Sequence, residues 1–401
     1  MPQETYLIMI TAEQNNNKYY HMIPQGDSFR VEYGRVGAAP QVRTYPIYEW
    51  DKKYNEKIRK GYVDQTSIRL VDKVEPDGPK YKPISDKEIA ELVEELRRCA
   101  RQMIQSQYEV TSESVTQAMV DQAERVLNSL MRLTTVSAFN DRLIELFGVI
   151  PRRMSKVQEY IAQNSDQFGE IIQRERDILD VMAGQVQANK VEDEAKKKGS
   201  SKDVTGKTIL EVMGLSIVPA TKADVTKIKK QMGDISDHFD CAYKVVNKKT
   251  QKAFNAYLKE HPVITKLLWH GSRNENWWSI LNTGLALRPQ AQITGKMFGN
   301  GIYFAPKARK SLGYTSLEGS YWAGGRSSHA FMALFEIGYG TPKNVYSAGW
   351  REFDGYNYDR LKKDNPEADC VHAHAGRSLR NDEIIIYRED QLTIRYLVKI
   401  K

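Results

Sequence analysis

At 401 residues the chain is long enough for two or three domains, and its 41% of apolar residues predicts that they have true cores. No apolar run reaches about 18 residues and no basic-then-apolar signal opens the chain, so neither a membrane-spanning nor a secreted protein is expected. The net charge of +8 is concentrated in residues 206–401, whereas residues 83–205 carry more acidic than basic side chains. A basic chain fits a nucleic-acid or other polyanionic partner, and a solubilising charge excess is an equally good interpretation.

Residues 5–70 are predicted to be mainly β-strand. Short apolar runs occupy 6–10 and 21–23, and residues 29–34 alternate between apolar and polar as a half-buried strand does. Residues 46–60 have helical spacing and carry several basic side chains.

From residue 85 the pattern becomes helical. Ser85 and Glu88 have the spacing of a capping box, and apolar residues follow at i, i+3 and i+4. Similar stripes predict helices over 112–130 and 168–182. Residues 85–187 are therefore expected to form an all-α bundle of roughly four to six helices.

Two stretches are predicted to separate domains. Residues 70–85 are punctuated by proline and glycine, and residues 188–205 are polar, charged and without periodicity, which is typical of a linker or mobile loop. From residue 206 short β-rich runs dominate, with helical stretches between them. The expected strands are 241–246, 267–269, 301–304, 331–337, 383–387 and 393–400, and the expected helices are 222–232 and 250–259. The three cysteines, Cys99, Cys241 and Cys370, lie far apart, so neither a zinc set nor a disulfide framework is expected.

The most informative stretch begins at His270 and ends at Tyr314. His270 follows a strand-like run and precedes Gly271, where a ligand can approach the main chain. A glycine-dense turn then leads into an aromatic strand with Tyr303, and Ser311 follows. Two tyrosines can sandwich a flat ring, and a serine can hydrogen-bond an amide. Each residue alone is more often part of a core, but together they are typical of a pocket for nicotinamide and its ribose.

Two common nucleotide-binding loops are disfavoured. Gly295, Gly299 and Gly301 lead into a strand, whereas the dinucleotide fingerprint follows a strand and opens a helix. Residues 206–208 match the last three positions of the P-loop motif, but Ser201 stands where that motif requires its first glycine. A reaction that consumes NAD is therefore favoured over hydride transfer and phosphoryl transfer.

Two charged residues outside that stretch are candidate functional groups. Glu383 opens an apolar strand, where an unpaired buried carboxylate is costly, and an exposed strand start is the alternative. In a pocket, its carboxylate would stabilise oxocarbenium character on a ribose and orient a nucleophile. Arg35, between Gly34 and Gly37, is expected to be exposed and free to meet a phosphate, and a surface hairpin with an incidental arginine is an equally good interpretation.

Together these motifs resemble the poly(ADP-ribose) polymerase family along essentially the whole chain. The matching motifs, in order and at the family's spacing, are His270-Gly-Ser, Thr294-Gly, Met297 to Ala305, Lys310-Ser311 and Glu383-Ile-Ile-Ile-Tyr387. The resemblance implies a multidomain α+β protein. Its parts would be a small β-rich WGR DNA-binding domain over 1–75, an all-α helical regulatory domain over 85–200 and a mixed α/β ADP-ribosyltransferase catalytic domain over 206–401.

The resemblance also implies a role for each residue of the site. The family's histidine–tyrosine–glutamate triad falls on His270, Tyr303 and Glu383. His270 would bind the 2′-hydroxyl of the adenosine ribose, and Tyr303 would form one wall of the nicotinamide pocket. Glu383 would polarise the nicotinamide ribose and help to activate the acceptor hydroxyl during elongation.

The remaining NAD+ contacts follow from the same resemblance. The Gly271 main chain and Ser311 would hold the carboxamide, and Tyr314 would stack on the nicotinamide. Ser272 and Arg288 would lie along the adenosine side. NAD+ would be a substrate, and no metal is implied.

Some positions depart from the family pattern. Tyr33 stands where the WGR signature has tryptophan, although an aromatic ring there can still stack on a sugar or base. Tyr33 and Arg35 are the predicted DNA-binding residues. Lys296 occupies a position that is often aromatic, and residues 340–377 match poorly, which leaves polymer length and target choice open.

The sequence therefore predicts an NAD+-dependent ADP-ribosyltransferase, activated by DNA breaks, that modifies acceptor proteins and itself with poly(ADP-ribose) in the DNA damage response. The helical domain would restrain NAD+ access until the WGR domain meets a DNA end. The alternatives are mono-ADP-ribosyl transfer to proteins or DNA ends and a DNA-end binding protein whose catalytic fold is vestigial. An accessory partner is left open, and the expected location is the nucleus in a eukaryote, otherwise the cytoplasm or nucleoid.

Overall fold

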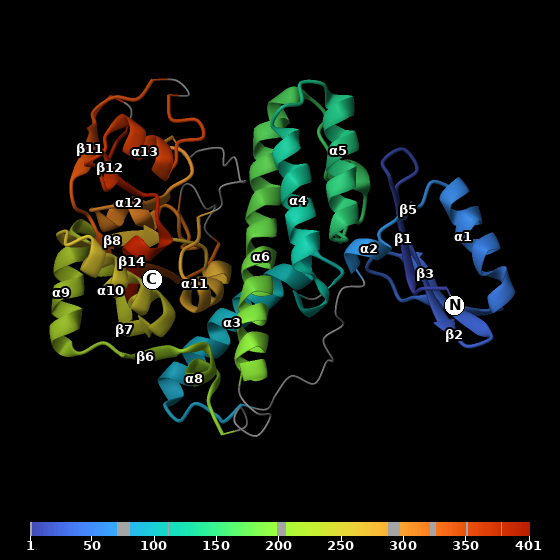
Figure 1. The fold of residues 1–401 in the computed structure, drawn as a ribbon, viewed down its shortest axis with the longest axis horizontal. Helices are drawn as coiled ribbons and strands as arrows, with labels where there is room; N and C mark the ends of the chain where they lie inside the picture. The colour runs from blue at the N-terminus through green and yellow to red at the C-terminus, as the bar shows by residue number, and fades with distance from the viewer. Residues whose placement is uncertain are drawn as a thin grey trace. The chain divides into compact units, whose positions relative to one another are not determined.

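The computed structural model describes residues 2–69, 81–110, 112–198, 206–287, 297–320, 326–349, 352–377 and 379–401. The chain forms two compact units, the first from residues 1–78 and 101–186 and the second from 79–100 and 187–401 (Figure 1). Within the described ranges, no helix is long and apolar enough to cross a membrane. Most of the expected linker 70–85 lies outside the described residues.

The first unit opens with a five-stranded antiparallel sheet in the order β4-β3-β2-β1-β5. Its strands are β1 (Thr5–Thr11), β2 (Asn16–Gln25), β3 (Ser28–Arg35), β4 (Gln41–Pro46) and β5 (Val63–Asp64), and α1 (Trp50–Arg59) follows β4. Alternate residues such as Leu7, Phe29 and Val31 are buried and pack with Trp50. The predicted strands and helix are confirmed, and β4 is an additional strand.

Besides α1, the first unit contains α2 (Thr66–Arg69), α4 (Gln117–Leu130), α5 (Val136–Val149) and parts of α3 (Lys87–Gln107) and α6 (Phe168–Lys198). α4 begins later than its sequence pattern predicts, because Thr116 caps it by accepting a hydrogen bond from Met119 N. At the start of α3, Ile89 N donates a hydrogen bond to Asp86 Oδ1. The predicted cap was the preceding residue, Ser85.

The prediction of a linker or loop over 188–205 is wrong for its first part, because α6 continues to Lys198. The stretch has no apolar stripe, but it is rich in alanine, glutamate and lysine, which have high helix propensity. Ala188 is buried in the core of the second unit. A mainly polar helix was therefore predicted to be a linker. Residues 199–205 lie outside the described part of the chain.

The second unit contains two sheets (Figure 1). The first has the order β6-β7-β14-β10-β8, from β6 (Leu215–Pro219), β7 (Phe239–Asn247), β14 (Leu392–Ile400), β10 (Ala330–Gly338) and β8 (Thr265–Gly271). The second has the order β11-β12-β13-β9, from β11 (Pro342–Val345), β12 (Cys370–Ala373), β13 (Glu383–Ile386) and β9 (Ile302–Phe304). The predicted strands of this region are confirmed.

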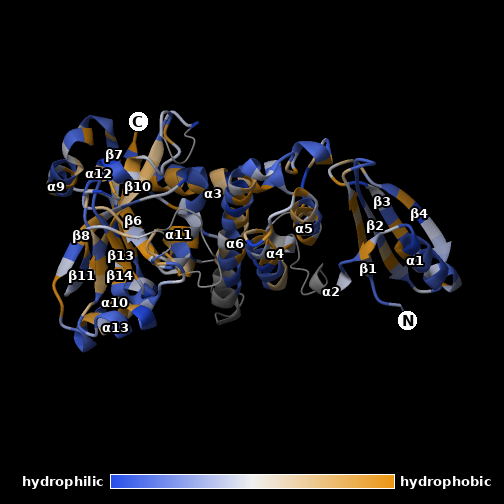
Figure 2. Cartoon of the chain, turned by 90° about the horizontal axis from the view of Figure 1, so that it is seen from above, coloured by the Kyte–Doolittle hydropathy of each residue, from blue (hydrophilic) through white to orange (hydrophobic). Residues whose placement is uncertain are grey.

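Helices cover both faces of the larger sheet. They are α8 (Ile209–Met213), α9 (Lys222–Met232), α10 (Lys248–Glu260), α11 (Trp277–Thr283) and α12 (Ala308–Leu312), while α13 (Tyr358–Asp364) accompanies the smaller sheet. Along β10, Phe331 and Phe335 pack into one core and Met332 and Leu334 into another. A strand buried on both faces needs an unbroken apolar run, which β10 has from Ala330 to Phe335. Figure 2 shows apolar residues along the strands and polar ones on α9 and α13.

The part of α3 up to Ala100 belongs to the second unit. Ile89, Leu92 and Leu96 join the core of the larger sheet, where Trp278 also packs. On the polar side, Glu95 Oε2 accepts a hydrogen bond from Lys399 Nζ at 3.0 Å, and the other carboxylate oxygen contacts His329 Nε2. This part of α3 is therefore held to the sheet by both apolar packing and a charged cluster.

Replacing Glu95 with glutamine should destabilise the protein by roughly 1.5–3 kcal/mol at neutral pH, because hydrogen bonds to a charged group are lost. Burial alone would raise the pKa of Glu95, but the hydrogen bonds from His329 and Lys399 outweigh it and the pKa is lowered. A carboxyl group whose pKa is lowered in the folded state stabilises the fold at pH values above its ordinary pKa. This contribution is lost as the pH falls through the lowered pKa. The stability difference between the wild type and Glu95→Gln, measured by thermal unfolding, should therefore shrink in acid.

The matched control is Glu91→Gln, because Glu91 lies one turn earlier on α3 and pairs only at the surface with Lys87. Its effect should be small at every pH. Equal losses from the two substitutions would contradict the assignment.

Candidate active site

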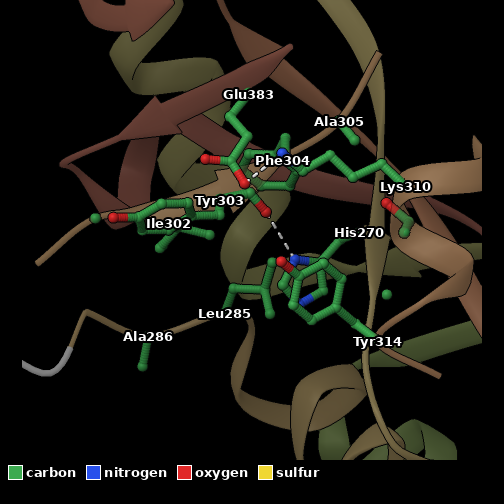
Figure 3. A pocket seen from close by; sticks show the side chains of 13 residues that line it. His270, Leu285, Ala286, Ile302, Tyr303, Phe304, Ala305, Lys310, Tyr314 and Glu383 are labelled. Atoms are coloured by element: carbon green, nitrogen blue, oxygen red, sulfur yellow. Dashed lines mark hydrogen bonds and ion pairs between the residues drawn. The ribbon is translucent and has the colours of Figure 1, made fainter. Parts of the chain in front are cut away.

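A pocket lies where the two sheets of the second unit meet. Trp269 on β8 and Ala305 just after β9 exchange two main-chain hydrogen bonds of 2.9 Å, which join an edge of each sheet. The adjoining cavity has a volume of about 240 Å³. Its lining residues are His270, Gly271, Leu285, Ala286, Gly301, Ile302, Tyr303, Phe304, Ala305, Lys310, Ser311, Tyr314 and Glu383 (Figure 3).

The ring of His270 is held from two sides. Its Nδ1 lies 3.0 Å from the main-chain oxygen of Tyr303, and because a carbonyl only accepts, this contact places the proton on Nδ1. The edges or tilted faces of Trp277, Phe304 and Phe335 surround the ring at centroid distances of 5.8 to 6.4 Å. The imidazole therefore has a fixed orientation and a fixed tautomer.

The ring of Tyr303 is positioned by the glycine-dense turn that precedes β9. The phenol oxygen accepts a hydrogen bond from Phe298 N at 2.9 Å and donates one to Gly299 O at 3.0 Å. Gly299 has a φ of 75°, and a Cβ there would lie 2.5 Å from the carbonyl oxygen of Tyr356, so only glycine fits. Burial raises the pKa of Tyr303 far above that of a free phenol, so Tyr303 stays neutral.

Glu383 enters the pocket from β13, where Ile385 pairs with Tyr303 on β9. The carboxylate is 8% exposed, and its Oε1 lies 2.5 Å from Lys310 Nζ (Figure 3). Lys310 comes from α12 and also donates to Asn381 O at 3.3 Å. The ion pair supplies the partner that a buried carboxylate needs. Lys310 was expected only as part of a motif and not as a site residue.

One wall of the pocket combines a close main-chain contact with an open aromatic ring. A Cβ on Gly271 would lie only 1.9 Å from the carbonyl oxygen of Ser311, so β8 and α12 touch through glycine. Ser311 is buried, whereas Tyr314 is 42% exposed at the rim. Burial, with a smaller effect of Glu383, raises the pKa of Tyr314, so the ring is an uncharged stacking surface.

The structure does not bring every predicted ligand contact into this pocket. Ser272 does not line it, and its Oγ accepts a hydrogen bond from Asn276 Nδ2 at 3.1 Å. Arg288 lies outside the described residues, as do Thr294 and Lys296. Leu285 and Ala286 line the pocket without having been predicted, because nothing in their local sequence distinguishes them from ordinary apolar residues.

The expectation that Arg35 is free to meet a phosphate is wrong. Its guanidinium donates hydrogen bonds to the main-chain oxygens of Asn15 at 2.7 Å, Met154 at 3.2 Å and Ser155 at 2.6 Å. The side chain therefore links the first sheet to the chain that follows α5. Tyr33 lies on β3, with the Arg43 guanidinium 5.9 Å from its ring centroid. Arg43 is exposed on β4.

Comparison with known proteins identifies both ends of the chain. Residues 216–401 match the poly(ADP-ribose) polymerase catalytic domain, and residues 3–69 match the WGR domain. The chain is 34% identical over 164 residues to the putative poly [ADP-ribose] polymerase-like 100L of Invertebrate iridescent virus 6. The matched region covers 39% of this chain and 83% of that protein. It is 36% identical over 187 residues to the uncharacterized protein 101L of the same virus, covering 46% and 77%. It is also 26% identical over 276 residues to poly [ADP-ribose] polymerase 2 of Caenorhabditis elegans, covering 57% of this chain and 49% of that protein.

A two-sheet catalytic unit with this pocket, together with these similarities, defines an ADP-ribosyltransferase that uses NAD+ as its substrate. The chain belongs to the poly(ADP-ribose) polymerase family and carries a WGR domain.

Replacing Gly271 with alanine should reduce NAD+ turnover on the order of 100-fold, because the new methyl group pushes α12 and Ser311 away from β8. The measurement is the rate of nicotinamide release by the folded variant. The matched control is Gly206→Ala, because no atom lies within 4 Å of a Cβ at Gly206. Full activity of Gly271→Ala would contradict the close contact.

Proposed function

We propose that this protein transfers ADP-ribose from NAD+ to acceptor proteins, itself included, as a polymer in response to DNA breaks. The observation that carries the proposal is the convergence of His270, Tyr303 and Glu383 on one pocket, from three different strands. The family's three residue types thus meet around a cavity of about 240 Å³, which the proposal assigns to the nicotinamide half of NAD+. The proposal assigns residues 1–75 to DNA binding, 85–200 to regulation and 206–401 to catalysis.

In the proposed mechanism the nicotinamide half of NAD+ enters between Tyr303 and Tyr314. The main chain of Gly271 and the hydroxyl of Ser311 hold the carboxamide, and His270 binds a ribose hydroxyl of the adenosine half. Ser272 and Arg288 are proposed to lie along the adenosine side. Aromatic walls contribute about 0.5–1.5 kcal/mol each beyond the area that they bury, which favours the flat ring.

The reaction breaks the bond between the ribose C1′ and the nicotinamide nitrogen. The bonding electron pair leaves with nicotinamide, which becomes neutral, and positive charge develops on the ribose. The Glu383 carboxylate stabilises that charge through the ribose hydroxyls and accepts the proton of the attacking acceptor hydroxyl. Lys310, 2.5 Å from Glu383, keeps the carboxylate oriented toward the cavity.

Regulation by DNA is proposed for the first unit. A WGR domain is generally a nucleic-acid binding module, and β4 and α1 offer exposed basic residues, among them Arg43 and Lys52. Arg35 hydrogen-bonds to the chain at 154–155, which supports a coupling between the WGR domain and the helices. In a eukaryotic cell the site of action would be the nucleus.

The function is tested by incubating the protein with labelled NAD+, with and without nicked or blunt-ended DNA, and sizing the products on a gel. DNA-stimulated ladders are the expected result. A single product size would favour mono-ADP-ribosyl transfer. DNA binding without NAD+ turnover would favour a vestigial catalytic fold.

Glu383→Gln should lower polymer formation on the order of 100- to 1,000-fold, because the neutral amide no longer stabilises the developing positive charge. NAD+ affinity, measured by equilibrium binding, should change little. The control is Glu367→Gln, an exposed carboxylate outside the pocket. Polymer formation at the wild-type rate would refute the role of Glu383.

Arg35→Ala and Arg43→Ala should have different effects. Arg43→Ala is expected to weaken DNA binding and to lower the slope of log affinity against log salt concentration by about 1, because one phosphate contact is lost. Arg35→Ala should leave that slope unchanged but reduce DNA stimulation of NAD+ turnover, because its partners are carbonyl oxygens of the protein. Identical salt slopes for both variants would contradict this division.

A further inference from the structure

A group of metal-binding side chains lies outside the NAD+ pocket. His372 and His374 lie at and just beyond the end of β12, and Asp382 immediately precedes β13. One donor atom from each lies within 4.8 Å of the other two. His372 Nε2 is 2.9 Å and His374 Nδ1 is 3.6 Å from the same oxygen, Asp382 Oδ2. None of the three lines the NAD+ pocket.

The second polar atom of each of these side chains has a partner of its own. Tyr339 Oη lies 2.7 Å from His372 Nδ1, and Asn344 Oδ1 lies 2.8 Å from His374 Nε2. Asp382 Oδ1 accepts a hydrogen bond from Ala375 N at 2.8 Å. Metal-binding histidines and carboxylates are held in this way, with an outer partner that fixes the ring orientation and directs the lone pair inward.

The three side chains are also held by packing. The His374 ring lies between Tyr346, at a centroid distance of 4.5 Å, and His372, at 3.9 Å. Exposed fractions of 14% for His372, 24% for His374 and 35% for Asp382 leave an opening to solvent. A site with three protein ligands and one open position is a common arrangement for zinc.

The surroundings of His372 and Asp382 act on their charge in opposite directions. Burial lowers the pKa of His372, and the neighbouring His374 and Lys266 act in the same direction, while Asp382 opposes them. Burial would raise the pKa of Asp382, but hydrogen bonds from Ala375 N and His372 outweigh it, so the carboxylate stays ionised. The group thus offers two imidazole nitrogens and one carboxylate oxygen as ligand atoms.

We propose that His372, His374 and Asp382 bind a Zn²⁺ ion, with water as the fourth ligand. Zinc–nitrogen and zinc–oxygen bonds of about 2.0–2.2 Å place tetrahedral ligand atoms roughly 3.3–3.5 Å apart, so small changes in side-chain torsion suffice. Two imidazoles and a carboxylate suit zinc better than calcium or magnesium, which take oxygen ligands. On binding, the ring proton of His372 moves from Nε2 to Nδ1, where Tyr339 Oη can accept its hydrogen bond, and the Nε2 lone pair is left for the metal.

The bound ion would fasten β12 to the residue that precedes Glu383. Ala373 pairs with Glu383 across the two strands, so the ion would lie beside the pair that carries the catalytic carboxylate. The ion would limit movement of β13 without contacting the substrate.

The test uses the full-length protein, treated with a chelator and then titrated with zinc chloride alone by calorimetry. The wild type should bind one equivalent of Zn²⁺ and unfold at a higher temperature with the metal than without. His374→Ala should lower the affinity at least about 10-fold and abolish the thermal shift, and Asn344→Leu should lower affinity by about 10- to 100-fold through loss of the outer hydrogen bond.

The matched control is His261→Ala, which removes another histidine of the same unit outside the group. It should retain the wild-type zinc affinity. The competing interpretation is a simple hydrogen-bonded network in which Asp382 accepts protons from the imidazoles. Absence of saturable zinc binding by the wild type, or undiminished binding by both His374→Ala and Asn344→Leu, would overturn the proposal in favour of that network.

Discussion

The active site depends on the main-chain bridge between Trp269 and Ala305. These two hydrogen bonds join the larger sheet to the smaller one, and each residue stands next to part of the site. His270 follows Trp269 directly, and Tyr303 lies two residues before Ala305. Because a strand pair fixes the register of both chains, the imidazole and the phenol ring are positioned by backbone geometry rather than by a flexible loop. Glu383 reaches the same cavity because β13 pairs with β9.

The chemistry of the pocket follows from what surrounds its charged and polar groups. The hydroxyl of Tyr303 is fully engaged by the turn at Phe298 and Gly299, which makes the ring a rigid wall rather than an acid or base. The buried carboxylate of Glu383 has a counterion in Lys310, so an anion can be kept where a cationic transition state is proposed to form. A preorganised anion of this kind acts without the reorganisation that water would need.

The sequence was less informative wherever local pattern and tertiary context disagree. β4 was not singled out because its side chains are mostly exposed and show no apolar alternation. The later turns of α6 were interpreted as a linker because they lack an apolar stripe, although their residues favour helix. Arg35 was expected to be free, yet carbonyl oxygens at residues 154–155, far along the chain, accept its hydrogen bonds. No local signal in the sequence indicates a partner that distant.

The sequence by itself determined the family, the order of most sheet-forming and helical regions, and the side chains that are proposed to meet NAD+. These properties depend on residue type, spacing and periodicity, which are local. Only the tertiary structure decided which of those side chains share a cavity, that Lys310 is the partner of Glu383, and that His372, His374 and Asp382 form a group. Such contacts depend on strand pairing and register across tens of residues, and no local pattern specifies them.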